Sequence, residues 1–203
     1  MGTRALIKPL DIYGKPICTI YTQFDGYPDG VPLDVAKYLA KRKLVNGIGM
    51  GEHFKVVNGM DDLTAQIIAY LKIKYTEVMK RYTKEKGDGL AAGTIYVMPP
   101  EAKDVDEEYI YYIYPDPEYA ELMKKQHELY DKLWKLIDEG KGETEEAEAI
   151  RQLLREIEKE FFDRKWDIYI KATRPDGKVL FDGTVQEYVK KYSQNEPKMM
   201  EGT

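Results

Sequence analysis

The sequence predicts an α+β fold: about six largely antiparallel strands, three helices packed on the sheet, and an inserted antiparallel helical hairpin. Residues 109–114 and 166–170 are rich in aromatic and β-branched residues, which is typical of strands. About fifty residues carrying two helical patterns separate them, although two antiparallel strands need only a tight turn. The helical segment is therefore predicted to replace that turn.

The hairpin itself is predicted from apolar residues that recur every three or four positions. This spacing makes one apolar seam per helix, and two helices joined by a short turn at 139–142 can bury their seams against each other. A helix of about 23 residues is about 35 Å long, so the pair is expected to reach beyond a small domain. The seam residues are Tyr119, Leu122, Gln126, Leu129, Leu133 and Leu136, followed by Ala147, Ile150, Leu154, Ile157 and Phe161.

The N-terminal half predicts a hairpin of strands followed by two helices. Residues 3–8 and 17–24 alternate as strands around a turn-forming segment. Pro32 is expected in the first turn of a helix that extends to about Lys43. A long helix is predicted over residues 61–84, and its inward face comprises Leu63, Ile67, Leu71, Tyr75, Val78 and Tyr82.

The C-terminal half supplies the remaining strands and one capped helix. Strands are predicted over 94–98, 108–114, 165–173 and 178–181. Thr184 is expected to cap a last helix, with Glu187 at the capping-box position three residues later. These elements predict one domain from residues 1–114 and 165–193, an inserted acidic hairpin over 115–164, and a flexible tail over 194–203.

The negative charge of the chain lies in the hairpin. The net charge is −5, and residues 115–164 hold nine Lys or Arg against fifteen Asp or Glu, a balance of −6, which leaves +1 elsewhere. An acidic arm disfavours contact with phosphates, so direct nucleic-acid binding is not expected, and it favours a basic protein surface. The alternative interpretation is a solvated helical face with no partner.

Cysteine content and the first residues predict a protein of the cell interior. Cys18 is the single cysteine, so no disulfide within the chain and no cysteine metal cluster can form. The first residues lack an apolar signal region, and no run approaches 18 apolar residues. We therefore expect a cytoplasmic protein, without a cofactor or a metal.

A loop and one histidine are the candidates for chemistry. Asp25 and Asp29 lie four residues apart around Tyr27, where two carboxylates could bind a cation or act as acid and base. Asp-Gly pairs also form turns, and that interpretation is favoured because the calcium-loop spacing does not match. His53 follows Glu52 and could act as a base, but no nucleophile is near in sequence. No catalytic residue is therefore assigned.

The tyrosines of the strand at 109–114 are a second set of candidate binding residues. Tyr109, Tyr111, Tyr112 and Tyr114 could stack on nucleobases. They alternate between the two faces of the strand, however, and no basic stripe accompanies them in sequence. Packing in the core and across strands is therefore the favoured interpretation.

The surface of the hairpin is the predicted site of partner binding. Tyr130 and Trp134 are candidate anchors, because aromatic residues dominate binding energy at interfaces. Acidic side chains would steer the encounter with a basic partner. They are Glu143, Glu145, Glu146, Glu148, Glu156 and Glu160.

Four segments together resemble a widespread family of small proteins of phages and archaeal viruses, mostly without an assigned function. They are Gly2–Ile7, Ile20–Gly30, Asn58–Met60 and Gly93–Tyr96. The resemblance covers roughly residues 2–114 and, more loosely, 166–192, and the acidic hairpin departs from the family pattern. Few Asn, Gln and Cys beside many Lys and Glu agree with a hot environment.

The resemblance extends to type III-B anti-CRISPR proteins of rod-shaped archaeal viruses. It implies a viral inhibitor of host defence that binds a CRISPR effector subunit or an associated ribonuclease in the host cell interior. It provides no catalytic residues. Two other interpretations stay open: a nucleotide- or RNA-cleaving enzyme that uses Asp25, Asp29 or His53, and a homodimer in which two hairpins form a four-helix bundle.

Overall fold

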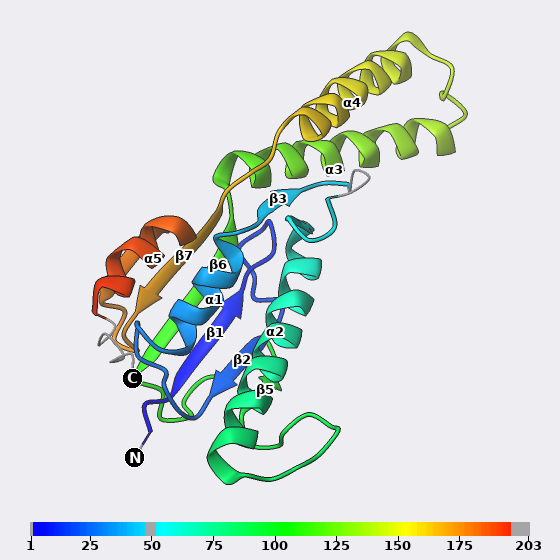
Figure 1. Cartoon of the computed structure of the whole chain (residues 1–203). Coiled ribbons are helices and arrows are strands. Elements are labelled where there is room, and N and C mark those ends of the chain that lie inside the picture. The colour runs from blue at the N-terminus through cyan, green and yellow to red at the C-terminus, as the bar shows by residue number, and fades with distance from the viewer. Residues whose placement is uncertain (1, 48–51, 196–203) are drawn as a thin grey trace.

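A computed structural model of the chain describes residues 2–47 and 52–195, and it has the mixed α+β architecture that the sequence predicts (Figure 1). The described strands are β1 (Ala5–Pro9), β2 (Thr19–Thr22), β3 (Lys43–Val45), β4 (Val56–Asn58), β5 (Ile95–Met98), β6 (Tyr109–Pro115), β7 (Ile168–Thr173) and β8 (Val179–Thr184). The described α-helices are α1 (Val31–Leu39), α2 (Gly59–Thr83), α3 (Pro117–Asp138), α4 (Glu145–Asp163) and α5 (Val185–Tyr192).

Six strands form one sheet in the order β5-β2-β1-β6-β7-β8. Four of its five neighbouring pairs are antiparallel, and the central pair β1–β6 is parallel, with Ala5 opposite Tyr109 and Ile7 opposite Tyr111. The predicted N-terminal hairpin is confirmed by the antiparallel pairing of β1 with β2. The six strands are the six that the sequence predicts.

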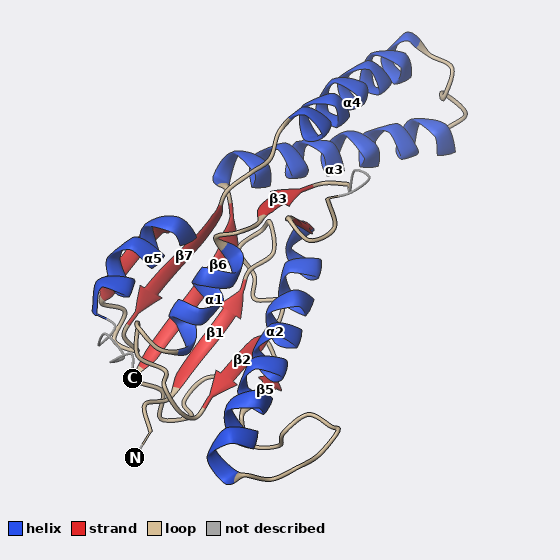
Figure 2. Ribbon diagram, viewed as in Figure 1, coloured by secondary structure: helices blue, strands red, loops and turns tan. Residues whose placement is uncertain are grey.

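One face of the sheet carries all three packing helices. Figure 2 shows α1, α2 and α5 lying over the same side of the strands. Alternate strand residues point to these helices: Tyr111 and Ile113 of β6 are fully buried, as are their β7 partners Ala172 and Ile170. The main core therefore lies between this face and the three helices.

The two N-terminal helices differ from their prediction at the C-terminal ends. Helix α1 ends at Leu39, and Lys43 begins strand β3, so the predicted extension to Lys43 is wrong. In α2, Leu63, Ile67 and Leu71 are buried as predicted, whereas Val78 is 36% exposed and Tyr82 is 84% exposed. The inward assignment of these two residues is wrong because the last turns of α2 extend past the edge of the sheet (Figure 1).

A second, two-stranded sheet was not predicted. Strands β3 and β4 pair in parallel, and Leu44 of β3 also bridges to Trp166 through two backbone hydrogen bonds of 2.9 Å. Strands of three residues are too short to give a recognisable alternation. This small sheet connects α1, the start of α2 and the chain entering β7.

The C-terminal helix begins as the sequence predicts. The Thr184 side chain accepts a hydrogen bond from the Glu187 backbone N–H, and the Glu187 carboxylate accepts one from the Thr184 backbone. Residues 193–195 form a 3-10 turn, and the rest of the predicted tail lies outside the described residues. No helix in the described ranges is long and apolar enough to cross a membrane.

Helices α3 and α4 form the predicted hairpin and project from the end of the sheet (Figure 1). Residues 116–164 are called the arm below. Asp116 caps α3 by accepting from the Glu118 backbone N–H, and Pro117 occupies its first turn. The seam is confirmed: Leu122 and Leu136 are partly buried, and the buried residues include Tyr119, Gln126, Leu129, Leu133, Ala147, Ile150, Leu154, Ile157 and Phe161.

Candidate functional site

The root of the arm is an aromatic cluster that belongs to the core. Tyr119, Phe161 and Trp166 meet with ring centroids 5.5 to 6.3 Å apart, and each is at most 3% exposed. The Arg164 guanidinium lies 3.7 Å from the centre of the Trp166 ring and bonds the Glu118 and Glu160 carboxylates. The two arm helices are thereby tied to each other and to the start of β7.

Contacts from the domain hold the arm at further points. The Tyr13 hydroxyl, from the turn between β1 and β2, lies 3.1 Å from His127 Nδ1 on α3. The Asn46 amide, after β3, lies 3.3 Å from the Met123 sulfur. The inner part of α3 therefore rests on the domain, and the outer half of the arm extends beyond it (Figure 1).

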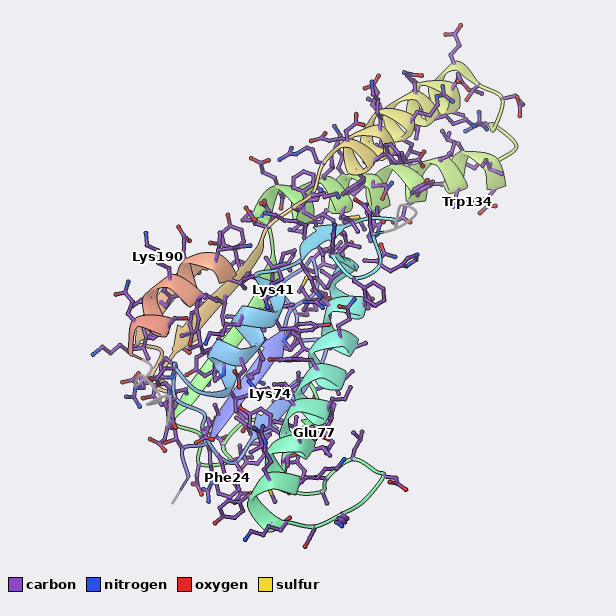
Figure 3. All side chains as sticks on the ribbon, in the orientation of Figure 1. Phe24, Lys41, Lys74, Glu77, Trp134 and Lys190 are labelled. Carbon is purple, nitrogen blue, oxygen red and sulfur yellow. The ribbon has the colours of Figure 1, made fainter. Side chains whose placement is uncertain are left out.

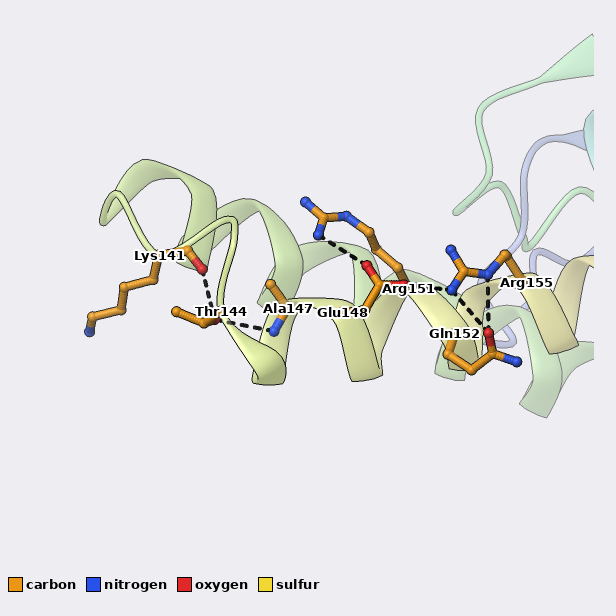
Figure 4. A network of polar contacts seen from close by, with 7 residues as sticks. All are labelled: Lys141, Thr144, Ala147, Glu148, Arg151, Gln152 and Arg155. Atoms are coloured by element: carbon orange, nitrogen blue, oxygen red, sulfur yellow. Dashed lines mark hydrogen bonds and ion pairs between the residues drawn. The ribbon is translucent and has the colours of Figure 1, made fainter.

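The turn at the tip of the arm is closed by its own polar contacts. The Thr144 hydroxyl donates to the Lys141 carbonyl and accepts from the Ala147 backbone N–H (Figure 4). Glu148 pairs with Arg155 at 2.7 Å and with Arg151 at 3.5 Å. These contacts, led by the hydrogen bond from Arg155, lower the pKa of Glu148. Glu148 is therefore engaged within α4.

The six predicted steering glutamates divide into two groups. Glu148 and Glu160 are ion-paired within the arm, and Glu156 accepts a hydrogen bond from Gln152 at 3.2 Å. The carboxylates of the other three are exposed, and none of them forms a hydrogen bond or a close ion pair with a residue in the described ranges, although Lys141 attracts Glu146: Glu143, Glu145 and Glu146. They lie around the N-terminus of α4, where acidic groups also stabilise the helix dipole. Among the six predicted glutamates, the three without a partner thus lie at the tip of the arm.

The two predicted aromatic anchors have different environments. Tyr130 is partly buried, and its hydroxyl donates to Glu158 at 2.7 Å, which raises the pKa of the tyrosine. Trp134 lies one turn further out on α3 and is 61% exposed (Figure 3). Tyr130 therefore serves the packing of the arm, whereas Trp134 has a free indole surface.

Other exposed apolar side chains on the arm were not singled out from the sequence. Ile137 on α3 is 38% exposed, Leu153 on α4 is 40% exposed, and Phe162 near the root is 86% exposed. Each is the direct sequence neighbour of a seam residue and lies beside the seam on its helix, which is the signal that could have identified them. Ile137 lies three residues after Trp134 and shares its side of α3.

Hydrogen bonds from two buried tyrosines of the core fix the loop at 23–30. The buried Tyr111 hydroxyl donates to the Gly26 carbonyl at 2.9 Å, and the buried Tyr188 hydroxyl donates to the Pro28 carbonyl at 2.8 Å. Asp25 adopts a positive φ of 55°, and its side chain accepts from the Tyr27 hydroxyl at 3.1 Å. Asp29 is half-buried in the same loop. These contacts support the turn interpretation, with α1 starting directly afterwards.

The structure does not bring His53 to this loop. His53 is exposed between β3 and β4, beyond the C-terminal end of α1, whereas Asp25 and Asp29 precede its N-terminal end. Figure 1 shows β3 beside the arm, at the other end of the domain. Across the described residues, no group of three or more His, Cys, Asp or Glu is arranged to hold a metal ion. The three candidates therefore do not form one site.

Among known proteins, the chain matches no family model, no curated protein and no solved structure. The viral resemblance accordingly stays a prediction from the sequence.

Proposed function

We propose that this protein acts by binding another protein through the outer half of its arm. The observation that carries the proposal is Trp134, 61% exposed on an arm whose seam is already buried within itself. A large exposed indole is not needed for the stability of the helix pair. Tryptophan is enriched among the residues that dominate interface energies.

The charge at the tip defines the kind of partner. Glu143, Glu145 and Glu146 follow the end of α3 and lie 9 to 12 residues after Trp134 along the chain. Exposed carboxylates attract a basic surface and raise the rate of encounter, while an aromatic anchor slows dissociation. A basic protein surface with an apolar recess is therefore the expected counterpart.

The partner to test first is a type III CRISPR effector subunit or its associated ribonuclease. Such proteins handle RNA and present basic surfaces, which an acidic arm can occupy. The chain would then be a viral inhibitor of host defence that works in the host cell interior. This choice rests on the resemblance of the four sequence segments.

Shortening the arm beyond its root should abolish capture of the partner. The variant replaces residues 127–153 by a short turn and keeps Tyr119, Phe161 and Trp166, so the core cluster remains. We expect the full chain to capture effector subunits from an archaeal host lysate and the shortened chain to capture none. Mass spectrometry of the retained proteins is the measurement, and binding to the purified subunit confirms it.

A point variant tests the contribution of Trp134 to binding separately from the contribution of the whole arm. Trp134→Ala should weaken affinity for the captured subunit at least tenfold, because hot-spot truncations cost 2 kcal/mol or more. Tyr82→Ala is the matched control, since Tyr82 is 84% exposed on α2, outside the arm. Equal capture by the full and the shortened chain would move the binding site to the sheet domain.

Neutralising the tip should slow association without changing the fold. We expect Glu143→Gln, Glu145→Gln and Glu146→Gln together to lower the association rate and its dependence on salt. Glutamine is chosen because lysine at these positions would also oppose the dipole of α4. The charge-matched control is Glu85→Gln, Asp88→Asn and Glu101→Gln, all exposed and outside the arm. Indistinguishable association rates for the two triple variants would contradict the steering role.

Pairing of two arms is the second candidate, and the exposed Ile137 and Leu153 favour it. Two arms aligned through these residues would form a four-helix bundle. Light scattering at micromolar concentration distinguishes binding of another protein from self-association. A protein that is monomeric in this range, and dimerises only at higher concentration, has its outer arm free for another protein. A stable dimer that Trp134→Ala dissociates would favour self-assembly.

A further inference from the structure

The six-stranded sheet ends in two edge strands, β5 and β8, which differ in how they oppose pairing with a further strand. Edge strands of natural proteins are commonly blunted by charged side chains or bulges, because their outer backbone groups can pair with another chain. Strand β8 carries Asp182, and its pairing with β7 contains a register irregularity. The Lys191 amine also donates to the Leu180 carbonyl of β8 at 3.0 Å. Further pairing at the β8 edge is therefore opposed.

Strand β5 lacks these features. Its four residues, Ile95–Met98, are all uncharged, and each has a partner in the regular pairing with β2. Tyr96 is 43% exposed and Val97 is 55% exposed. Pro99 follows directly and limits the strand to this length. The β5 edge is thus short, neutral and accessible to solvent.

The backbone hydrogen bonds of β1 show in which direction each of its residues bonds. The Pro9 carbonyl accepts from Ile17, on the side of β2, whereas the Leu10 backbone N–H donates to the Ile113 carbonyl of β6. Successive residues of a strand direct their backbone groups to opposite sides. Ile7, two residues before Pro9, therefore bonds towards β2 as well.

The same alternation, carried across β2, identifies the groups of β5 that point outward. The β2 residue opposite Ile7 bonds towards β1, so its neighbour Tyr21 bonds towards its partner Tyr96 of β5. The backbone N–H and C=O groups of Ile95 and Val97, on either side of Tyr96, then point away from the sheet. These outward groups form no hydrogen bond with any residue in the part of the chain that the structure describes.

We propose that the β5 edge pairs with the β5 edge of a second copy of this chain, so that the sheet continues across a two-fold axis. Outward N–H and C=O groups along an extended strand are recognised by another extended strand. Antiparallel pairing about Tyr96 places Ile95 opposite Val97 of the second copy. Each such pair can exchange both of its backbone hydrogen bonds, and the surface matches itself, as a two-fold interface requires.

The side chains favour a second copy over an unrelated segment. Ile95 belongs to the core under the helices, so the Tyr96 side chain lies on the opposite face, where its ring is 5.8 Å from the Tyr21 ring. In the proposed pairing the two Tyr96 rings lie opposite each other, and aromatic pairs across strands are stabilising. Ile95 and Val97 oppose each other without any charge. A charged foreign segment would find no complementary charge on β5.

This pairing is expected to be weak and reversible. A strand of four residues buries less surface than the roughly 1,200 Å² that specific stable interfaces bury in total. The chain should therefore be monomeric at micromolar concentration and pair at higher concentration. The arm projects from the other end of the sheet and can bind its own partner at the same time (Figure 1).

Amide hydrogen exchange of the full chain, followed by NMR from micromolar to millimolar concentration, tests the pairing at single residues. We expect the outward amides of Ile95 and Val97 to exchange at least fivefold more slowly at the highest concentration. The Tyr96 amide already bonds to β2 and should change little. Sedimentation equilibrium over the same range should show a monomer in exchange with a dimer.

Variants at the exposed valines of the two edge strands provide matched arms. Val97→Lys should raise the dissociation constant of the dimer at least tenfold, because a charge on an edge strand opposes the addition of another strand. Val97→Thr should keep the dimer, since threonine is neutral and also suits a strand. The control is Val179→Lys, because Val179 is 50% exposed on β8. Thermal unfolding of each variant checks that the fold is kept.

Three results would overturn the proposal: a chain that stays monomeric up to millimolar concentration, outward amides whose exchange does not depend on concentration, or a Val97→Lys variant that dimerises like the control. A dimer that Trp134→Ala dissociates and Val97→Lys leaves intact would also overturn it, because the arms would then join the two copies. So would an unrelated extended peptide that protects the outward amides of a chain that stays monomeric. Capture of a partner by the arm is measured separately, so failure here and failure of the arm proposal are distinguishable.

Discussion

We expect the free energy of unfolding to fall steeply above pH 10, by about 5 kcal/mol per pH unit. The cause is a set of buried or, for Tyr75, partly buried tyrosines whose pKa values burial raises: Tyr119 to about 12, and Tyr75, Tyr111 and Tyr188 further. In the unfolded chain each ionises near pH 10. Their stabilising contribution is therefore fully present below pH 10 and is lost as the pH rises towards the folded values.

The magnitude follows from linkage. Each tyrosine that is neutral when folded and ionised when unfolded costs about 1.4 kcal/mol per pH unit, and four such groups act together. Lys8 acts in the opposite direction, because burial lowers its pKa and the folded state gains relative stability as the pH approaches 10.5. One lysine does not offset four tyrosines, so the net effect is alkaline unfolding.

Urea unfolding at pH 9, 10 and 11, with tyrosinate absorbance as a second probe, measures this effect. Tyr119→Phe removes one titrating group and should reduce the slope by about one quarter. Tyr82→Phe is the control, since Tyr82 is exposed on α2. A stability that stays constant from pH 9 to pH 11 would show that these hydroxyls ionise equally in both states.

We expect Trp166→Ala to lower the free energy of unfolding by about 3–5 kcal/mol, the range for a large buried aromatic residue. Trp166 is 1% exposed and contacts Tyr119 and Phe161 edge-on or tilted. Arg164 would also lose the ring on which its guanidinium lies. The backbone bridge to Leu44 remains, because it does not depend on the side chain.

Trp134→Ala is the matched control, because it removes the other tryptophan from an exposed position on the arm. Surface substitutions usually change stability by no more than about 0.5 kcal/mol. The denaturant midpoint of the Trp166 variant should therefore lie clearly below that of the Trp134 variant. The dependence of the unfolding free energy on denaturant concentration should be the same for both. Similar midpoints would mean that the arm root contributes little to the cooperative core.

The elements with a strong local pattern were predictable from sequence. The seam of the arm repeats over eleven positions, and the capping box of Thr184 and Glu187 lies within four residues, so no distant contact is needed to recognise either. The six strands of the large sheet were likewise identified, because alternation and turn residues are local signals. Trp134 was predicted as a candidate anchor from its residue type and its place on the arm, outside the seam.

Features that depend on distant residues were not predictable. The parallel pairing of β1 with β6 and the short strands β3 and β4 leave no local signal. Val78 and Tyr82 continue the apolar pattern of α2, but they lie beyond the sheet that would bury them. The periodicity therefore predicted more buried residues than the structure has. Which residues of β6, β7 and β8 lie beside one another depends on the register of three strands, and register is set by tertiary structure.

The insertion of the arm has a consequence for the order of folding. Ala5 of β1 pairs with Tyr109 of β6, a separation of 104 residues, so the centre of the sheet cannot form until more than half the chain has emerged from the ribosome. The arm, by contrast, contains mostly local contacts and can form within microseconds to milliseconds. Once formed, it brings Pro115 beside Ile168, and closure of the β6–β7 pair no longer spans a flexible loop of about fifty residues. The arm would thus accelerate assembly of the sheet on which it stands.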